Sequence, residues 1–272
     1  MPELPEVETT RRGLAPHLIG HRIAAVTIRD ARLRWPIAAD LAGHITGQRI
    51  QGLRRRAKYL IVELERDALI VHLGMSGALR IVPVRTPAGK HDHFELVLDT
   101  GSVLRLTDPR RFGSIHRVRG EPERHVLLAN LGPEPLSEQF DAQSLHRTTR
   151  GRRASIKETL MNARVVVGVG NIYASEALFR SRIHPRTPAG TISLRRYAVL
   201  VTAVQETLRE AIEAGGSSLR DWHHADGSLG YFQQRYFVYD REGEACRVCA
   251  TPVRAIRQGQ RATYYCPRCQ RR

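Results

Sequence analysis

Apolar residues recur with two different periods along the first 120 residues of the chain. Val7, Leu14 and Leu18 fall on one side of a helix that the pattern predicts over residues 3–19, and Gly20 ends it. Short segments rich in β-branched residues follow, with turn-forming pairs between them. The predicted strands span residues 22–28, 59–64, 69–73, 94–98, 103–107 and 114–118. Such a series with one or two helices predicts an antiparallel sandwich or barrel.

The pattern changes beyond residue 130. Residues 131–153 join a stretch containing Gly and Pro to a polar run, which predicts a linker. Apolar residues three or four positions apart then predict helices over residues 156–161, 172–179 and 194–214, with Ser193 as a suitable N-cap for the last of them. The sequence therefore predicts a β-rich amino half, a helical carboxyl half and a small terminal module.

The charge of the chain indicates a polyanionic partner. Its 272 residues include 43 Lys+Arg against 27 Asp+Glu, a net charge of +16. Each phosphate that a cation neutralises releases condensed counterions, so this excess suits nucleic acid. A membrane-surface binder is the alternative, but we find no basic helix with a Trp/Phe/Leu face. With no apolar run near the roughly 20 residues that cross a bilayer and no secretory signal, we expect a cytoplasmic protein without a membrane partner.

All four cysteines lie in the last 27 residues, as two CxxC pairs that are 16 residues apart. This spacing is typical of a closed tetrahedral zinc site, which supplies folding energy and leaves no position for a substrate. The predicted ligands are Cys246, Cys249, Cys266 and Cys269. A redox role for the CxxC pairs is the alternative. Arg254, Arg257 and Arg261 lie between the pairs and suit phosphate contacts, or else a solvated basic tail.

The chain begins Met1-Pro2-Glu3, a sequence from which the initiator methionine is usually removed. Pro2 would then carry a free secondary amine beside the Glu3 carboxylate. A terminal amine titrates near pH 8, about 2.5 units below lysine, so a useful fraction is neutral and nucleophilic at pH 7. Its attack on an aldehyde-level carbon forms a cationic iminium. The alternative is an ordinary helix start, where Pro and acidic residues are favoured.

Two predicted loops contain an apolar residue beside glycine or arginine. Phe112 and Arg110 lie in DPRRFG, between two predicted strands, where Phe112 suits an apolar wedge pushed between base steps. Met75 lies in HLGMSG, whose glycines suggest a tight, exposed turn. For both side chains, burial in the core is the alternative.

Two polar residues are candidates for phosphate contacts. Asn171, in GVGNIY, follows two glycines at the predicted start of a helix, a position that attracts phosphate. No βαβ unit surrounds this stretch, so a dinucleotide cofactor is not expected. Lys58 ends the basic run RRRAK before a predicted strand, where it is either a positioned cation or a solvated edge lysine.

Together, and in this order, these motifs resemble one family over the whole chain: the bacterial formamidopyrimidine-DNA glycosylases, also called 8-oxoguanine DNA glycosylases. The matching segments are MPELPEVE, KYL, HLGMSG, KHDHFEL, DPRRFG, LGPEPL, VVVGVGNIYASEALF, the loop at 215–231 and the zinc finger. The resemblance implies an α+β multidomain fold. It has a β-sandwich with flanking helices (1–130), a linker (131–153), a helix–two-turns–helix domain (154–237) and a four-cysteine zinc finger (238–272).

The resemblance also implies a mechanism. Pro2 is similar to the nucleophile that attacks C1′ of the damaged nucleoside, and Glu3 to the acid that protonates the sugar ring oxygen. Lys58 resembles the lysine that grips phosphate beside the lesion, and Arg261 resembles a further phosphate contact; the resemblance places both with Pro2 and Glu3 in the catalytic set. The iminium formed on Pro2 would allow successive β- and δ-elimination, which leaves a one-nucleotide gap. No redox cofactor is needed, and the one zinc ion is structural.

The remaining site residues implied by the resemblance contact DNA. Met75, Arg110 and Phe112 resemble the trio that fills the hole left by the flipped base and pairs with the orphaned cytosine. Arg111 is then a phosphate contact. The full predicted set is Glu6, His72, Met75, His93, Arg110, Arg111, Phe112, Lys157 and Asn171. Asn162 stands where the family commonly has Asp, which puts one local hydrogen bond or salt bridge in doubt.

The expected partner is damaged double-stranded DNA, bound by a monomer in the bacterial cytoplasm at the nucleoid. Two other functions stay open. An enzyme of the endonuclease VIII type would prefer oxidised pyrimidines, but MPELPEVE and DPRRFG favour the purine enzyme. A non-catalytic DNA-binding protein would keep the fold and the zinc finger, but the intact Pro2-Glu3 pair and Lys58 argue against it.

Overall fold

The computed structural model describes residues 1–217 and 231–271. They form two compact units, one of Met1–Ala129 with Ala214–Tyr231 and one of Asn130–Glu213 with Phe232–Arg272. Most of the loop at 215–231, where the sequence predicts one of the matching segments, lies outside the described residues.

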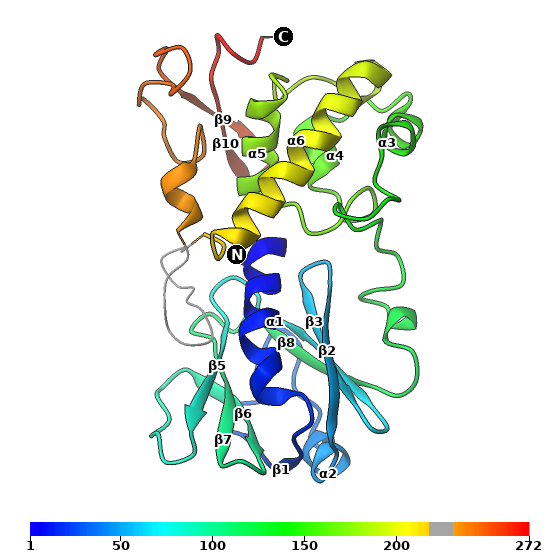
Figure 1. The fold of residues 1–272 in the computed structure, drawn as a ribbon, viewed down its shortest axis with the longest axis vertical. Coiled ribbons are helices and arrows are strands. Elements are labelled where there is room, and N and C mark those ends of the chain that lie inside the picture. The colour runs from blue at the N-terminus through cyan, green and yellow to red at the C-terminus, as the bar shows by residue number, and fades with distance from the viewer. Residues whose placement is uncertain (218–230, 272) are drawn as a thin grey trace. The chain divides into compact units, whose positions relative to one another are not determined.

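The first unit contains the predicted sandwich, as two four-stranded antiparallel sheets (Figure 1). One sheet has the order β1-β6-β7-β5, formed by Ile23–Ile28, Asp92–Leu98, Ser102–Thr107 and Ala78–Pro83. The other has the order β2-β3-β4-β8, formed by Ile50–Arg56, Tyr59–Leu64, Ala68–His72 and Ser114–Val118. All six predicted strands are confirmed.

The predicted first helix, α1 (Leu4–Leu18), packs against both sheets. Its Val7, Leu14 and Leu18 are at most 1% exposed and belong to the same apolar core as side chains of both sheets. A short helix α2 (Leu41–Ile45) and a 3₁₀ turn (Pro122–Arg124) complete this unit. Because burial of this face orients α1, the core sets the position of the amino terminus.

Strands β2 and β5 lie outside the segments that the pattern predicted. In β2 only Ile50 and Leu53 are buried, and three consecutive arginines, Arg54–Arg56, follow them. As an edge strand, β2 pairs with β3 alone and tolerates these charges. The basic composition therefore concealed this strand from the apolar pattern. The run RRRAK comprises the last three residues of β2 and the two-residue turn that follows.

The second unit is helical apart from a two-stranded hairpin. Its helices are α3 (Ala142–Thr149), α4 (Ile156–Leu160), α5 (Asn171–Arg180) and α6 (Leu194–Glu213), with 3₁₀ turns at Ala189–Thr191 and Phe232–Arg235. The hairpin pairs β9 (Arg254–Gln258) with β10 (Arg261–Tyr265). The Oγ of Ser193 accepts the Arg196 N–H at 3.4 Å, which confirms the predicted cap. No helix within the described residues is long and apolar enough to span a membrane.

The segment predicted to be a linker, residues 131–153, contains α3 and belongs to this second unit. Asp141 caps the helix by accepting the Ser144 N–H at 2.6 Å. Leu145 and Thr149 are buried, and α3 packs against α6. The interpretation of this segment as a simple linker is therefore corrected: its polar composition conceals a helix with one buried face.

Candidate functional site

The chain becomes buried at the residue after Met1, which is itself 37% exposed. Pro2 and Glu3 are both buried, and the helix begins at Leu4. Glu6 holds the backbone here, because its Oε2 accepts the Glu3 N–H at 2.8 Å and its Oε1 accepts the Ser217 N–H at 2.8 Å. Gly216 has φ +77°, and a Cβ there would lie 3.1 Å from Oε1 of Glu6, so glycine suits this contact.

The terminal amine shares its surroundings with two acids and two cations. Burial lowers the pKa of the amine of Met1, and the charges of Lys58 and Arg110 lower it further, against the opposing effect of Glu3 and Glu6. A lowered pKa favours the neutral, nucleophilic amine. Removal of Met1 would transfer the amine to the buried Pro2, one residue further into this cluster.

The loops HLGMSG and DPRRFG are fastened to each other. Ser76 Oγ donates to Asp108 Oδ1 at 2.8 Å, and the Gly113 N–H donates to Asp108 Oδ2 at 2.8 Å. Gly74 has φ +65°, and a Cβ on it would lie 2.3 Å from the backbone carbon of Phe112. Only glycine allows the two backbones to come this close. The two loops therefore form one supported surface.

Met75 and Phe112 project from this surface. Met75 is 39% exposed and Phe112 is 42% exposed, which argues against the alternative that either residue fills the core. The Arg110 guanidinium lies over the Phe112 ring at 5.0 Å. Arg111 adopts a left-handed backbone conformation, with φ 55°. Its guanidinium forms an ion pair with Asp30 at 2.8 Å, which links the loop to the segment just after β1. Its predicted phosphate contact stays a prediction.

His72 is a neutral hydrogen-bond donor. Its Nδ1 accepts the Gly74 N–H at 3.0 Å, which leaves Nε2 to carry the proton. Burial, followed by the charges of Lys58 and Arg34, lowers the pKa of His72 to about 4. The ring packs against Tyr59 with centroids 4.9 Å apart. A neutral N–H of this kind can contact a phosphate oxygen at every pH above about 5.

We expect His72 to make the protein less stable as the pH falls. The unfolded chain takes up a proton near the ordinary pKa of 6.5, whereas folded His72 resists it down to about 4. The stabilising contribution, about 3 kcal/mol, is therefore complete above pH 6.5 and is lost as the pH falls toward 4. Urea unfolding at a series of pH values measures it, and His72→Asn should flatten the slope. The exposed His17→Asn is the control, and an equal effect of both variants would contradict the assignment.

The two histidines of KHDHFEL lie in different surroundings. His93, the predicted DNA contact, is 1% exposed, and its Nε2 lies 2.9 Å from the backbone oxygen of Asp108. In the described structure it supports the DPRRFG loop from within. His91, which the sequence analysis missed, is partly exposed. Positions 91 and 93 would share one face of a regular strand, but His91 lies outside β6 and the pairing register shifts between Asp92 and Phe94. The motif alone therefore could not show which imidazole is accessible.

In the second unit, Lys157 of α4 forms hydrogen bonds with α5 and with β10. Its side chain is 2% exposed, and its Nζ donates to Asn171 Oδ1 at 2.6 Å and to Thr263 Oγ1 at 2.6 Å. Asn171 Nδ2 donates to the Ala262 carbonyl at 3.0 Å. Helices α4 and α5 are thus bonded to β10, beside the exposed Arg261. The structure brings these three predicted residues together, and it buries Lys157.

Glu176 is a structural residue that the sequence analysis missed. It lies on α5, 1% exposed, and accepts the backbone N–H groups of Phe237, Val238 and Tyr239 at 2.9, 3.0 and 2.8 Å. Burial raises the pKa of this carboxyl, against these hydrogen bonds. The one charged residue in the otherwise uncharged, mostly apolar run IYASEALF was the signal that could have revealed it.

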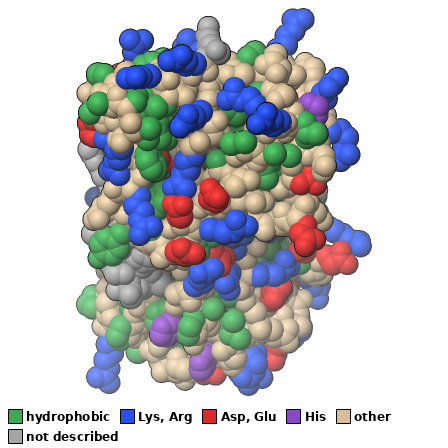
Figure 2. Space-filling view, turned by 45° about the horizontal axis from the view of Figure 1, so that its top comes forward, with side chains coloured by type: hydrophobic (Ala, Val, Ile, Leu, Met, Phe, Trp, Pro, Cys, Tyr) green, Lys and Arg blue, Asp and Glu red, His purple; other side chains and the backbone are tan. Residues whose placement is uncertain are grey.

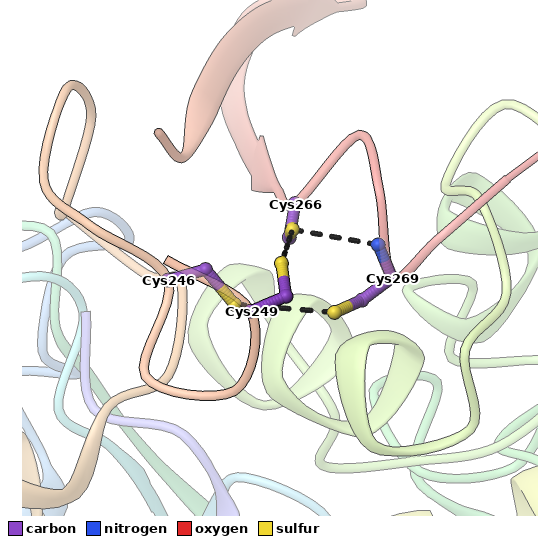
Figure 3. A group of neighbouring side chains, drawn as sticks. All are labelled: Cys246, Cys249, Cys266 and Cys269. Atoms are coloured by element: carbon purple, nitrogen blue, oxygen red, sulfur yellow. Dashed lines mark hydrogen bonds between the residues drawn. The ribbon is translucent and has the colours of Figure 1, made fainter. Parts of the chain in front are cut away.

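The four cysteines form one cluster (Figure 3). Their sulfur atoms all lie within 4.8 Å of one another, with Cys246 and Cys269 at 4.0 Å and Cys249 and Cys266 at 3.4 Å. Tetrahedral Zn–S bonds of 2.3 Å place sulfurs about 3.8 Å apart, so the donor set fits zinc. The N–H groups of Val248 and Cys269 point at cysteine sulfurs, at 3.5 and 3.4 Å. Arg254, Arg257 and Arg261 are exposed on the adjoining hairpin.

Lys and Arg side chains are spread over the face shown in Figure 2, with acidic side chains among them. Part of the positive charge of the chain is paired within the protein, as in Arg54 with Glu63.

Asn162, which stands where the family commonly has Asp, is exposed, and its Oδ1 accepts the Arg164 N–H at 3.0 Å. An aspartate oxygen could accept the same bond, so this local contact survives the substitution.

Three family models match the chain. The formamidopyrimidine-DNA glycosylase N-terminal domain matches residues 1–115, and the H2TH domain of the same glycosylase matches residues 131–222. The zinc finger found in FPG and IleRS matches residues 243–272. Together with the cysteine geometry, this last match establishes one structural zinc site.

Relatives and solved structures agree over the full length. Formamidopyrimidine-DNA glycosylases of Aromatoleum aromaticum and Methylococcus capsulatus are 58% and 56% identical, each covering 100% of both chains. The crystal structure of MutM (Fpg) from Thermus thermophilus is 41% identical with TM-score 0.88, covering 99% of this chain and 98% of that one. A Lactococcus lactis Fpg mutant in complex with Fapy-dG DNA is 34% identical with TM-score 0.93, covering 100% of both. The chain therefore belongs to the formamidopyrimidine-DNA glycosylases, the glycosylase and AP lyase enzymes of bacterial base excision repair.

Proposed function

We propose that this enzyme removes oxidised purines, namely 8-oxoguanine and formamidopyrimidines, from duplex DNA through a Schiff base on Pro2, and then cuts the strand. The observation that carries the proposal is the burial of Pro2 and Glu3 beside Glu6, whose carboxylate accepts the N–H groups of Glu3 and Ser217. The charges of Lys58 and Arg110 lower the pKa of the terminal amine at this place. An ordinary helix start requires neither feature. The Lactococcus lactis relatives bound to Fapy-dG and abasic-site DNA support the same substrate class.

The proposed reaction begins when the damaged nucleotide leaves the stack, which costs a few kcal/mol. The Pro2 nitrogen attacks C1′, and the electrons of the glycosidic bond leave with the base. Glu3 protonates the sugar ring oxygen, and the ring opens to an iminium. The positive charge acidifies the C2′ proton, whose removal expels the 3′ phosphate. A second elimination expels the 5′ phosphate, which leaves a one-nucleotide gap.

The loop residues offset the cost of base flipping. Exposed Met75 and Phe112 fill the space left in the duplex, as apolar wedges do in other kinked complexes. Arg110, held over the Phe112 ring, is placed to pair with the orphaned cytosine. Of the two imidazoles in KHDHFEL, we assign the DNA contact to the partly exposed His91, and to His93 the support of the loop.

The remaining assigned residues hold the DNA backbone. Lys58, His72, Asn171 and Arg261 take phosphates, and buried Lys157 orients Asn171 and the hairpin. The cysteine cluster keeps the arginine-bearing hairpin folded and takes no part in the chemistry, because four thiolates close the zinc coordination shell. We further propose that the enzyme acts as a monomer at the bacterial nucleoid.

Borohydride trapping tests the proposed function. The protein is incubated with a duplex carrying 8-oxoguanine opposite cytosine, and reduction should yield a covalent protein–DNA adduct with loss of the base. A parallel duplex with an oxidised pyrimidine should trap more slowly, and the reverse order would favour the endonuclease VIII type. Retention of DNA with neither adduct nor cut would identify a binding protein and overturn the proposal.

A further inference from the structure

Glu8, on the second turn of α1, contacts arginine side chains from two elements, α1 and β2. Arg11 and Arg12 from the same helix donate to it at 2.8 and 2.9 Å. Arg55 of β2 approaches from the sheet, with Nε 3.4 Å from Oε2 of Glu8. The side chains of Arg55 and Glu8 are only 12% and 13% exposed, whereas Arg12 is 57% exposed. The Glu8–Arg55 contact is therefore an inner link between α1 and β2.

The other arm of Arg55 reaches the turn that carries Lys58. Its Nη1 donates to the Ala57 carbonyl at 2.9 Å. Ala57 and Lys58 form the two-residue turn between β2 and β3, and Ala57 is 3% exposed with φ 56°. A left-handed conformation costs a residue with a Cβ about 1 kcal/mol, so this turn needs outside support. The carbonyl that Arg55 holds belongs to the peptide that joins Ala57 to Lys58.

We propose that Arg55 is a positioning residue for catalysis, which fixes the Lys58 turn relative to the helix that presents Pro2 and Glu3. The inference rests on the proposed function, in which the Pro2 amine attacks while Lys58 holds the phosphate beside the same sugar. Among the described residues, Arg55 contacts Glu8 and the Ala57 carbonyl, and in this proposal it acts through Lys58. Glu8 is its anchor on the helix.

The physical reason is that lysine has a long, flexible stem, so its reach is set by the backbone from which it starts. A misplacement of about 1 Å far from the chemistry can cost about 100-fold in rate. The fold itself does not depend on this link, since α1 and β2 are already joined through Leu14, Leu18 and Leu53 in the core. Loss of Arg55 should therefore affect geometry more than stability.

The test uses Arg55→Met, with Arg12→Met as the matched control, because Arg12 bonds the same carboxylate from the solvent side. We expect Arg55→Met to lower the single-turnover cutting rate at 8-oxoguanine by about 30- to 100-fold. Its Kd for duplex with an uncleavable tetrahydrofuran abasic analogue should stay within about threefold of wild type. Arg12→Met should match wild type in both. Arg55→Lys, which keeps the charge and loses one of the two arms, should fall between them.

A double-mutant cycle with Lys58→Ala shows whether Arg55 acts through Lys58. In that background Arg55→Met should lower the rate no further. Additive losses, an Arg55→Met rate within threefold of wild type, or an equal loss in Arg12→Met would each overturn the inference.

Hydrogen exchange supplies a readout that needs no activity. The amides of Lys58 and Tyr59 should exchange faster in Arg55→Met and remain unchanged in Arg12→Met. Unchanged exchange in Arg55→Met would overturn the inference even for an inactive protein. Failure of the proposed function appears differently, as a wild-type protein that forms no adduct and cuts no strand.

Discussion

A protein that retains Met1, or carries any residue ahead of Pro2, will bind DNA containing 8-oxoguanine and fail to cut it. The extra peptide bond converts the Pro2 nitrogen from an amine to an amide, which has no lone pair available for attack. The buried cluster around the terminus remains, so phosphate contacts survive. We expect the single-turnover cutting rate to fall by more than about 1000-fold, the order of loss when an enzyme nucleophile is removed.

Mass spectrometry first establishes which terminus each preparation carries. Cutting is then followed on gels, the adduct is trapped with borohydride, and affinity is measured by fluorescence anisotropy on the tetrahydrofuran duplex. Pro2→Gly keeps a terminal amine but replaces the secondary amine with a primary one, and it should form less adduct. Wild-type cutting by a protein proven to keep Met1, or undiminished adduct in Pro2→Gly, would remove Pro2 from the mechanism.

Loss of a zinc ligand should abolish tight DNA binding while leaving the amino-terminal cluster in place. Cys266 is fully buried and packs with Phe179, Val238 and Val253, so Cys266→Ser removes both a ligand and part of this small core. Structural zinc contributes about 10–16 kcal/mol in finger peptides, more than a hairpin of this size can replace. Because the hairpin carries Arg261 and accepts the hydrogen bonds of Lys157, we expect the Kd to rise at least about 100-fold, through loss of several phosphate contacts.

Zinc content by mass spectrometry should fall from one ion per chain to none, and anisotropy at fixed salt reports the affinity. Val248→Ala is the matched control. This residue lies between Cys246 and Cys249 and is 57% exposed, so its substitution should change neither quantity. Full affinity in a protein shown to be free of zinc would contradict the structural role of the metal.

The elements that the sequence predicted correctly are those in which a local pattern and a buried face coincide. In α1, the residues Val7, Leu14 and Leu18 were chosen by spacing and all lie in the core. Strand β3 has the predicted limits, since its buried residues Leu60, Ile61, Val62 and Leu64 are all apolar and nearly continuous in sequence. β2 and α3 were hidden because each contributes few buried side chains and many polar ones. Most residues of such elements are on the exposed face, so their overall composition is polar and does not reveal the few buried side chains.

The zinc ligands, the loops and the terminus were identifiable along the chain because each is a local motif whose spacing carries its chemistry. Four cysteines in two close pairs can surround one ion whatever the rest of the fold does. Other features depend on segments that are distant in sequence. They are the exposure of Met75 and Phe112, the burial of His93 and Lys157, and the contacts of Arg55 with Glu8 and with the turn before Lys58. Long-range packing alone sets which side of a strand faces water and which carbonyl a guanidinium reaches. The chain thus specified its candidate chemistry in local motifs, and tertiary packing decided which of those side chains are buried, exposed or in contact.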